Sequence, residues 1–379
     1  MNKIYSSILF FFCSHVMYAA DNLPGDSAKT LITAGLEKKK VRDYRRAIDC
    51  FSKAIEIDSA SSSAFLNRAY CKNELMDYPS AIDDFTKALL VSQTWDEAFE
   101  AYYNRGLTEI LLQDFRNAIN DMNYAIKIYP EYSDAYYNRS IIKGKLGDFA
   151  GELKDISKAI ELKPTSRAYN SRGIVNSVMG RSWDAINDFT QSLALNDTNV
   201  NAYFNRGLVY YDLKEYEKAL NDFTSCIRIK PDPDAYNRRG NAKRRMEDFN
   251  GAYEDYTAAL NLKRDFYVAY LNRGCLKYDL EDYLSAIENF SLAIQLKPDY
   301  SAAYYCRGLA KEKLGDHEGE IADYTQAIEF KPDYEEAYFK RGMAKYIVAD
   351  DKRSGCEDLN RAVKLGNNSA YDFLIAHCK

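Results

Sequence analysis

An arginine that returns about every 34 residues is the feature of this 379-residue chain that most restricts its fold. Successive spacings are 37, 34, 33, 34, 33, 34, 34 and 34. The nine positions are Arg68, Arg105, Arg139, Arg172, Arg206, Arg239, Arg273, Arg307 and Arg341. So regular a period is typical of a repeat architecture, in which one structural unit is copied along the chain. The two or three compact domains that the length alone would indicate are therefore not required.

Other residue types keep fixed distances from this arginine. An aromatic residue stands three positions before it, glycine follows it in seven of nine cases, and Leu, Met or Val stands seven after it. These positions share one face of a helix. Alanine or another small residue at 13 and 20 positions after it, and an apolar residue at 17, share one face of a second helix. An acidic residue before an aromatic marks the turn between the helices, and proline ends the second helix.

The spacing predicts an all-α chain of two-helix repeats that stack on one another, because one hairpin cannot cover its own apolar face. A decayed first repeat, with Ala47, Phe51 and Ala54 in the second-helix positions, brings the number to ten. The predicted domains are a signal peptide at 1–20, a linker at 21–27, the repeat array at 28–368 and a capping helix at 369–379. Three additional residues near Thr94 to Glu97 are expected to form a loop between repeats two and three.

The N-terminal segment differs from the repeats. It has one lysine, an apolar run from Ile4 to about Tyr18, and then Ala19 and Ala20. This is the layout of a secretory signal peptide, and the run is short for a membrane span. We expect an exported protein that is periplasmic, envelope-associated or extracellular. An uncleaved anchor is the alternative, because Tyr18 stands where cleavage after Ala20 would favour a small residue.

The pattern of aromatic, glycine, alanine, aromatic, alanine and proline resembles the tetratricopeptide repeat (TPR) family over about nine tenths of the chain. Arginine before the glycine is a departure, and N-R-G followed by A-I-x-D-F looks like a subtype of the family. The resemblance implies a right-handed superhelical solenoid of about ten repeats. It also implies that the first helices form a concave wall that binds a protein or an extended peptide.

An acidic residue stands sixteen positions after almost every arginine. Repeat one lacks both partners, since Ala34 and Cys50 occupy the two positions. We therefore predict partly buried ion pairs between the two helices of a repeat, because neither charge is then left uncompensated. The predicted structural pairs are Arg105 with Asp121, Arg139 with Asp155, and Arg206 with Asp222. A row of cations that face a ligand is the alternative.

The predicted partner-binding residues lie beside these arginines. The family resemblance implies that asparagines one position before the arginine face the groove, where an amide can hold a peptide main chain. These are Asn67, Asn104, Asn138, Asn205 and Asn272. The aromatic candidates are Tyr103, Tyr137, Phe204, Tyr211, Tyr278 and Tyr305, whose polar-tipped or apolar rings suit recognition surfaces. The alternatives are a solvated helix face for the asparagines and packing between repeats for the aromatics.

Repeat seven carries a basic patch that could hold a carboxylate. Its members share roughly one side of the first helix and are Asn237, Arg238, Asn241, Arg244 and Arg245. The patch does not complete the two-cation, two-asparagine clamp that some TPR proteins use, because the adjacent repeats lack the matching lysines. A solvated helix face is the alternative interpretation.

No catalytic motif is found in the sequence, so we expect no enzyme activity. Of the eight cysteines, Cys13 lies in the predicted signal peptide. The other seven are scattered without a C-x-x-C pair, and each is interpreted as a small packing residue. A net charge of −5 does not favour nucleic acid. We expect a protein or peptide partner, no cofactor, no metal, and membrane contact only through an uncleaved N-terminus. The function predicted is an interaction scaffold; the alternative is an assembly or regulatory subunit of an exported or envelope complex that binds through an edge or its convex face.

Overall fold

The computed structural model describes residues 26–348 and 351–378. The regular structure in these residues is entirely helical, which confirms the predicted all-α class. The predicted signal peptide lies outside the described residues. The helices are α1 (Asp26–Lys40), α2 (Tyr44–Ile57), α3 (Ser62–Glu74), α4 (Tyr78–Val91), α5 (Trp95–Leu111), α6 (Phe115–Ile128), α7 (Ser133–Lys145), α8 (Phe149–Leu162), α9 (Ser166–Val178), α10 (Ser182–Leu195), α11 (Val200–Asp212), α12 (Tyr216–Ile229), α13 (Pro233–Arg245), α14 (Phe249–Leu262), α15 (Tyr267–Asp279), α16 (Tyr283–Leu296), α17 (Ser301–Leu314), α18 (His317–Phe330), α19 (Glu335–Ile347), α20 (Lys352–Lys364) and α21 (Asn368–His377).

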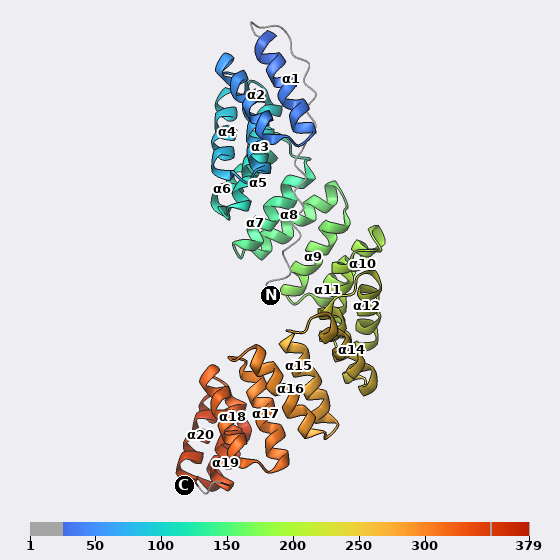
Figure 1. Cartoon of the computed structure of the whole chain (residues 1–379), viewed down its shortest axis with the longest axis vertical. Coiled ribbons are helices and arrows are strands. Elements are labelled where there is room, and N and C mark those ends of the chain that lie inside the picture. The colour runs from blue at the N-terminus through green and yellow to red at the C-terminus, as the bar shows by residue number, and fades with distance from the viewer. Residues whose placement is uncertain (1–25, 349–350, 379) are drawn as a thin grey trace. The chain divides into compact units, whose positions relative to one another are not determined.

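The helices pair into hairpins, and each hairpin is one repeat, as the ribbons of Figure 1 show. The chain divides after Asp197 into an N-terminal unit with α1 to α10 and a C-terminal unit with α11 to α21. Within each unit every hairpin packs on the next, so each is a solenoid of stacked repeats. The last helix, α21, packs against α20 and covers an apolar cluster that contains Leu359 and Ala362.

The turn inside a hairpin is built the same way in most repeats. The residue eight positions after the arginine adopts positive φ, as at Met76 (φ 63°) and Gly147 (φ 81°). The next residue is usually an aspartate whose carboxylate accepts a hydrogen bond from a backbone N–H of the second helix, as Asp77 does from Ser80. Such a cap satisfies an N–H group that has no partner within the helix. The chain therefore reverses within three residues, and the two helices lie against each other.

The core of a repeat is the contact between the glycine of the first helix and the aromatic ring of the second. A Cβ atom on Gly274 would lie 2.6 Å from the ring of Phe290, so glycine leaves room for the ring at this position. Repeat four shows the compensating change, because the buried Ser140 replaces glycine and Ile156 replaces the ring. This exchange keeps the helices closely packed.

The first helices of consecutive repeats also touch each other. In the N-terminal unit α1 contacts α3, α3 contacts α5 and α5 contacts α7; in the C-terminal unit α11 contacts α13, α13 contacts α15 and α15 contacts α17. Consecutive second helices do not come this close in the described part of the chain. The closer spacing bends each unit toward its first helices. We call the surface of the odd-numbered helices in either unit its inner wall.

Two expectations from the sequence are wrong. The three additional residues before repeat three do not form a loop, because α5 begins at Trp95 with Thr94 as its N-cap, and the residues lengthen this helix to 17 residues. The interpretation of every cysteine as a packing residue fails at the C-terminus. Cys356 of α20 and Cys378 form a disulfide with a Cα–Cα distance of 5.7 Å, which fastens the end of α21 to the last repeat.

Candidate functional site

The repeating arginine spans the two helices of its own repeat. Arg105 donates from Nε and Nη2 to the two carboxylate oxygens of Asp121, each at 2.8 Å. Arg139 with Asp155 and Arg206 with Asp222 have the same two-bond geometry. The aspartates are almost fully buried. The arginines are therefore engaged within the scaffold and do not present a row of free cations to a ligand.

The third nitrogen of the arginine reaches the preceding repeat, a contact that the sequence reasoning missed. Arg68 Nη1 donates to Ser52 Oγ at 3.0 Å, and Arg105 Nη1 donates to Thr86 Oγ1 at 2.9 Å. A serine, threonine or asparagine stands at this position in all nine repeats that precede an arginine, and that column was readable from the sequence. Its members are Ser52, Thr86, Asn123, Ser157, Thr190, Thr224, Thr257, Ser291 and Thr325.

A lysine four positions after the arginine joins the same aspartate in five repeats. Its ammonium lies 2.7–3.0 Å from the carboxylate. The five pairs are Lys72 with Asp84, Lys143 with Asp155, Lys243 with Asp255, Lys311 with Asp323, and Lys345 with Asp358. The site occupied by this ammonium group is called the ammonium position of the repeat.

The aspartate pKa moves in different directions in repeat four, which has this lysine, and in repeats three and six, which lack it. Burial raises the pKa of Asp155, but hydrogen bonds from Arg139 and Lys143 outweigh it and leave that pKa below its ordinary value. Repeats three and six have no lysine there, and burial raises the pKa of Asp121 and of Asp222 despite their arginines. One arginine alone thus does not fully offset the loss of solvent around the carboxylate.

Repeat three has a glutamate, Glu109, where other repeats have lysine. Burial, followed by the charge of Asp121, raises the pKa of Glu109 to about 8. At neutral pH the side chain is therefore mostly a neutral acid that can donate a hydrogen bond to Asp121, and its Oε2 has no hydrogen-bond partner. This arrangement keeps a second negative charge away from the buried aspartate.

Two further buried glutamates occupy the small-residue position of their second helices. Glu152 is 3% exposed, and its carboxyl group fills the space above Gly144 of α7. Burial raises the pKa of Glu152 to about 7. Glu320 is 2% exposed and lies 3.2 Å from Nδ1 of His317.

On the inner wall of the N-terminal unit, the predicted binding residues join neighbouring repeats. Asn138 donates to the hydroxyl of Tyr103 at 3.0 Å, and the hydroxyl of Tyr137 lies 3.0 Å from Ser171 Oγ. Asn67 accepts from Lys39, and Asn104 donates to the Glu100 carbonyl. Tyr103, Tyr137, Asn104 and Asn138 are all buried. The structure thus assigns them contacts between or within repeats and leaves them little surface.

The inner wall of the C-terminal unit is more open. Phe204, Tyr211, Tyr278 and Tyr305 are half-buried, as are Asn205 and Asn272. Their rings make edge or tilted contacts with aromatic residues of the second helices, for example Tyr278 with Tyr283. Each ring therefore packs on one side against a second helix and leaves part of its surface exposed on the inner wall.

The basic patch of repeat seven is partly used within the scaffold. Arg244 forms an ion pair with Asp279 of the next repeat, and Asn241 accepts a hydrogen bond from Tyr256. Asn237 is buried and accepts from Asn272. Arg238 and Arg245 remain exposed, the latter beside Tyr211. The patch therefore presents two exposed guanidinium groups.

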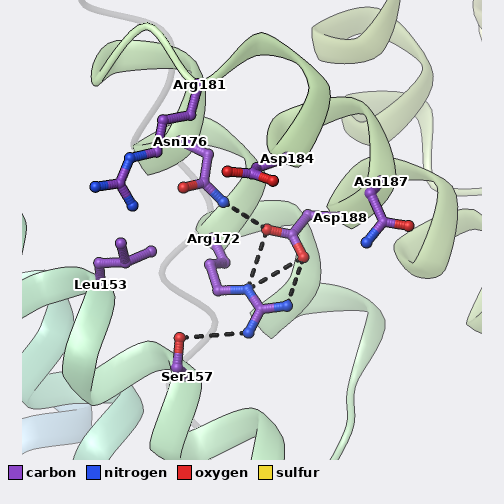
Figure 2. A pocket seen from close by; sticks show the side chains of 8 residues that line it. All are labelled: Leu153, Ser157, Arg172, Asn176, Arg181, Asp184, Asn187 and Asp188. Carbon is purple, nitrogen blue, oxygen red and sulfur yellow. Dashed lines mark hydrogen bonds and ion pairs between the residues drawn. The ribbon is translucent and has the colours of Figure 1, made fainter.

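A shallow cavity of about 250 Å³ lies in repeat five of the N-terminal unit. Residues of α8, α9 and α10 line it. Figure 2 shows Arg172, Asn176 and Asp188 joined by hydrogen bonds beside it, with the carboxylate of Asp184 near that of Asp188. The guanidinium of Arg181 lies away from these carboxylates. The remaining lining residues are Leu153, Ser157 and Asn187. The sequence reasoning did not find this cavity.

Neither a metal site nor a membrane span is found in the described ranges. Residues 26–348 and 351–378 contain no group of three or more His, Cys, Asp or Glu side chains arranged to hold a metal ion. No helix in these ranges is both long enough and apolar enough to cross a membrane.

A solenoid of two-helix repeats with a glycine-to-aromatic core defines a class of helical repeat proteins. Models of the tetratricopeptide repeat match residues 28–61, 99–132, 133–166, 200–233, 233–266 and 301–334, and a TPR repeat model matches 274–315. These matches together cover more than half of the chain. The chain therefore belongs to the tetratricopeptide repeat family.

Curated relatives match over short segments. DnaJ homolog subfamily C member 7 of Homo sapiens is 35% identical over 69 residues, which are 18% of this chain and 14% of that protein. Heat shock protein STI1 of Saccharomyces cerevisiae is 38% identical over 80 residues, which are 21% of this chain and 14% of that protein. The matched segments thus span about a seventh of each relative.

Solved structures match over longer segments at lower identity. A tetratricopeptide repeat protein from Parabacteroides merdae aligns with a TM-score of 0.54 and 20% identity, covering 65% of this chain and 99% of that one. Yeast Tom70 aligns with a TM-score of 0.52 and 15% identity, covering 92% and 95%. These similarities support the fold.

Proposed function

We propose that this protein is a non-enzymatic scaffold that binds an extended segment of a protein partner on the inner wall of its C-terminal unit. The observation that carries the proposal is the row of half-buried aromatic side chains on that wall: Phe204, Tyr211, Tyr278 and Tyr305. Amphipathic rings that are already held on one side lose little freedom on binding, and such rings are common in interfaces.

Family membership supports the same function. In tetratricopeptide repeats the hairpins stack into a scaffold, and in this chain the repeated arginine and lysine side chains are engaged within it. Proteins with matching segments include Heat shock protein STI1 and DnaJ homolog subfamily C member 7. Because the matched segments are short, the similarity supports an interaction role and not a particular partner.

The exposed charges of repeat seven favour a segment with an acidic group. Arg238 and Arg245 are exposed on α13, and Arg245 lies beside the aromatic Tyr211 of the preceding repeat. Guanidinium groups form two-point hydrogen bonds with carboxylates. We therefore expect the bound segment to place an aspartate, a glutamate or a C-terminal carboxylate beside this helix.

Site-specific photo-cross-linking tests the location. A photoreactive phenylalanine analogue is placed at Arg238 or Tyr278 on the inner wall, and at the exposed Arg228 of α12 as the matched control. The full chain is expressed in its native host. Cross-links to one partner from Arg238 and Tyr278, with none from Arg228, are expected. Cross-links from Arg228 alone would instead favour an assembly subunit that binds through its outer face.

A charge-reversal pair then tests the recognition chemistry on the partner that is found. Arg238→Glu with Arg245→Glu is expected to weaken binding at least tenfold, because two exposed cations beside the bound acid become anions. Arg228→Glu with Arg264→Glu makes the same change of charge away from the wall and is expected to leave the affinity within twofold. Equal effects of the two pairs would contradict a site on the inner wall.

We also infer two finer properties. The arginine before the glycine, tied to an aspartate in the second helix, supports membership of an N-R-G / A-I-x-D-F subtype. The layout of residues 1–20 supports export with removal of a signal peptide, an uncleaved anchor being the alternative. N-terminal sequencing of the mature protein distinguishes the two, since cleavage is expected to leave Asp21 at the N-terminus.

A further inference from the structure

The cavity between α8, α9 and α10 lies in repeat five, where the lysine of the other repeats is missing. Asn176 stands four positions after Arg172, the place that lysine holds in six repeats. Its amide Nδ2 donates to Asp188 Oδ2 at 2.9 Å, and that oxygen is the counterpart of the one that accepts the lysine in repeats two and four. Asparagine is shorter than lysine, so it fills less space than the lysine stem and ammonium, and a cavity lies beside it.

The sister repeats show what this space normally holds. Besides the carboxylate, the lysine ammonium has a backbone carbonyl partner twelve positions after the arginine: Lys72 donates to Ser80 O at 3.4 Å, and Lys243 donates to Gly251 O at 3.3 Å. The corresponding residues of repeat five are Asp188 and Asp184, and both line the cavity. The cavity is therefore lined by the two residues that correspond to the partners of the lysine ammonium in the sister repeats.

Repeat eight shows that the carboxylate attracts the ammonium. There Asn289 replaces the aspartate, and Lys277 turns away to Asp282 at 3.0 Å. In repeat five the carboxylate of Asp188 is present, and the lysine ammonium is absent. Asp184 adds a second carboxylate at the mouth, and it is exposed.

We propose that this cavity is a binding site for a primary ammonium group supplied from outside the chain, held between Asp184 and Asp188. The nearby Arg172 does not preclude it, because in five repeats an arginine and a lysine share one aspartate. An alkylammonium, either a lysine side chain or a free amine, matches a volume of about 250 Å³.

Arg181 limits which ligands fit. It stands at the turn position where the preceding repeat has the N-capping aspartate Asp148, and its side chain is exposed. Figure 2 places its guanidinium on the side of the cavity away from Asp184 and Asp188. An ammonium therefore enters beside the carboxylates. The nearby guanidinium weakens its binding.

Titration of the full chain with n-butylammonium, followed by NMR of the side-chain amides, tests the site. The Asn176 and Asn187 amide signals are expected to shift with a dissociation constant on the order of 1–10 mM, as suits a ligand of five heavy atoms. Acetate and n-butanol serve as control ligands and are expected to cause no shift. Shifts with acetate and none with n-butylammonium would overturn the proposal, because they would define an anion site.

Asn176→Lys is the decisive variant, because it restores the residue of the sister repeats. The new ammonium is expected to occupy the site, abolish the Asn187 shift and maintain or raise the melting temperature. Ser177→Lys adds the same charge at the exposed neighbour and is expected to retain binding within about threefold. Arg181→Asp is expected to tighten binding severalfold. Undiminished binding in folded Asn176→Lys protein would overturn the proposal.

A comparison of peptides with a free amine distinguishes the two sources of the ammonium group, a partner's lysine side chain and a free amine. A lysine-containing peptide is compared with the same peptide carrying Nε-acetyl-lysine and with n-butylammonium. Binding of the lysine peptide at least tenfold tighter than the free amine assigns the site to a partner's lysine side chain, and equal affinities assign it to a free amine. Equal binding of the acetylated and unmodified peptides would overturn an ammonium site.

Discussion

Arg105 Nη1 lies 2.9 Å from the hydroxyl oxygen of Thr86, a residue of the preceding repeat. The same guanidinium holds Asp121 of its own repeat through its other two nitrogens. One side chain therefore connects three helices, α4, α5 and α6, at each junction of this kind. Because a repeat array is stabilised by contacts between neighbours, these junctions contribute to cooperativity along the unit.

Thr86→Val tests the contribution of the hydroxyl at nearly constant volume. It removes the acceptor of Arg105 Nη1, and we expect unfolding to become easier by about 1–2 kcal/mol, as for a hydrogen bond to a charged group. Thr257→Val is the matched control, because the Thr257 hydroxyl occupies the same position but has no hydrogen-bond partner. We expect that change to be neutral or slightly stabilising. Urea denaturation measures both, and equal losses would contradict this role of the hydroxyl.

Arg206→Ala tests the ion pair itself. The variant leaves Asp222 buried, 4% exposed, with no arginine beside it, and repeat six has no lysine to replace it. Removing one partner of a buried pair costs about 3–5 kcal/mol. We expect a clear fall in melting temperature, partly recovered at acidic pH, where Asp222 takes up a proton. An unchanged melting temperature would show that the pair is not stabilising.

The periodic part of this molecule was predictable and the local exceptions were not. The pairing of Arg105 with Asp121 followed from the joint absence of both partners in repeat one, an observation in the sequence alone. The role of Thr86 was also readable, as a column of hydroxyl or amide residues, but nothing in the spacing showed that a neighbouring repeat comes within 3 Å. Contacts between repeats depend on how the hairpins stack.

The burial of side chains on the inner wall was likewise not predictable from the sequence. Asn104 and Asn138 occupy the position that faces the groove in the family pattern, yet both are buried. Their exposure depends on how closely α3, α5 and α7 approach one another, and large neighbours such as Tyr103 fill the intervening space. The cavity at Asn176 was missed because its meaning depends on lysine contacts in other repeats, which only the structure reveals.

Glu109 predicts an unusual dependence of stability on pH. Its folded-state pKa of about 8 is above its ordinary value of 4.5, so the folded protein binds the proton more tightly than the unfolded chain. The stabilisation is complete below pH 4.5 and is lost as the pH rises through about 8. Each unit of pKa difference corresponds to about 1.4 kcal/mol.

The variants Glu109→Gln and Glu109→Lys test this in unfolding experiments between pH 5 and 9. Glu109→Gln is expected to remove the loss of stability over that range. Glu109→Lys places lysine beside Asp121, as five sister repeats do, and is expected to raise stability at pH 8 by about 1–2 kcal/mol. If the wild type and Glu109→Gln had parallel pH profiles, Glu109 would not be the titrating group.

The hairpin turns predict a stabilising substitution. Met76 adopts φ of 63°, a conformation that costs a residue with a Cβ about 1 kcal/mol or more, and its side chain is 75% exposed. Met76→Gly is expected to stabilise the protein by up to about 1 kcal/mol, and Gly147→Ala, where φ is 81°, to destabilise it by about 1 kcal/mol. Lys87→Gly in α4 is the control and is expected to cost about 1 kcal/mol. Thermal unfolding measures all three.

The disulfide between Cys356 and Cys378 predicts a local effect of reduction. It closes a segment with a sequence separation of 22, and a loop of that length corresponds to about 3 kcal/mol in the chain-entropy account. Cys378→Ser is expected to speed amide hydrogen exchange in α20 and α21 at least tenfold and to leave exchange in α1 to α8 unchanged. Cys50→Ser, which removes a free thiol, is the matched control and is expected to alter neither region. Reduction of the wild type with dithiothreitol should reproduce the Cys378→Ser pattern. If exchange in α21 were the same before and after reduction, the apolar contacts with Leu359 and Ala362 alone would hold the capping helix.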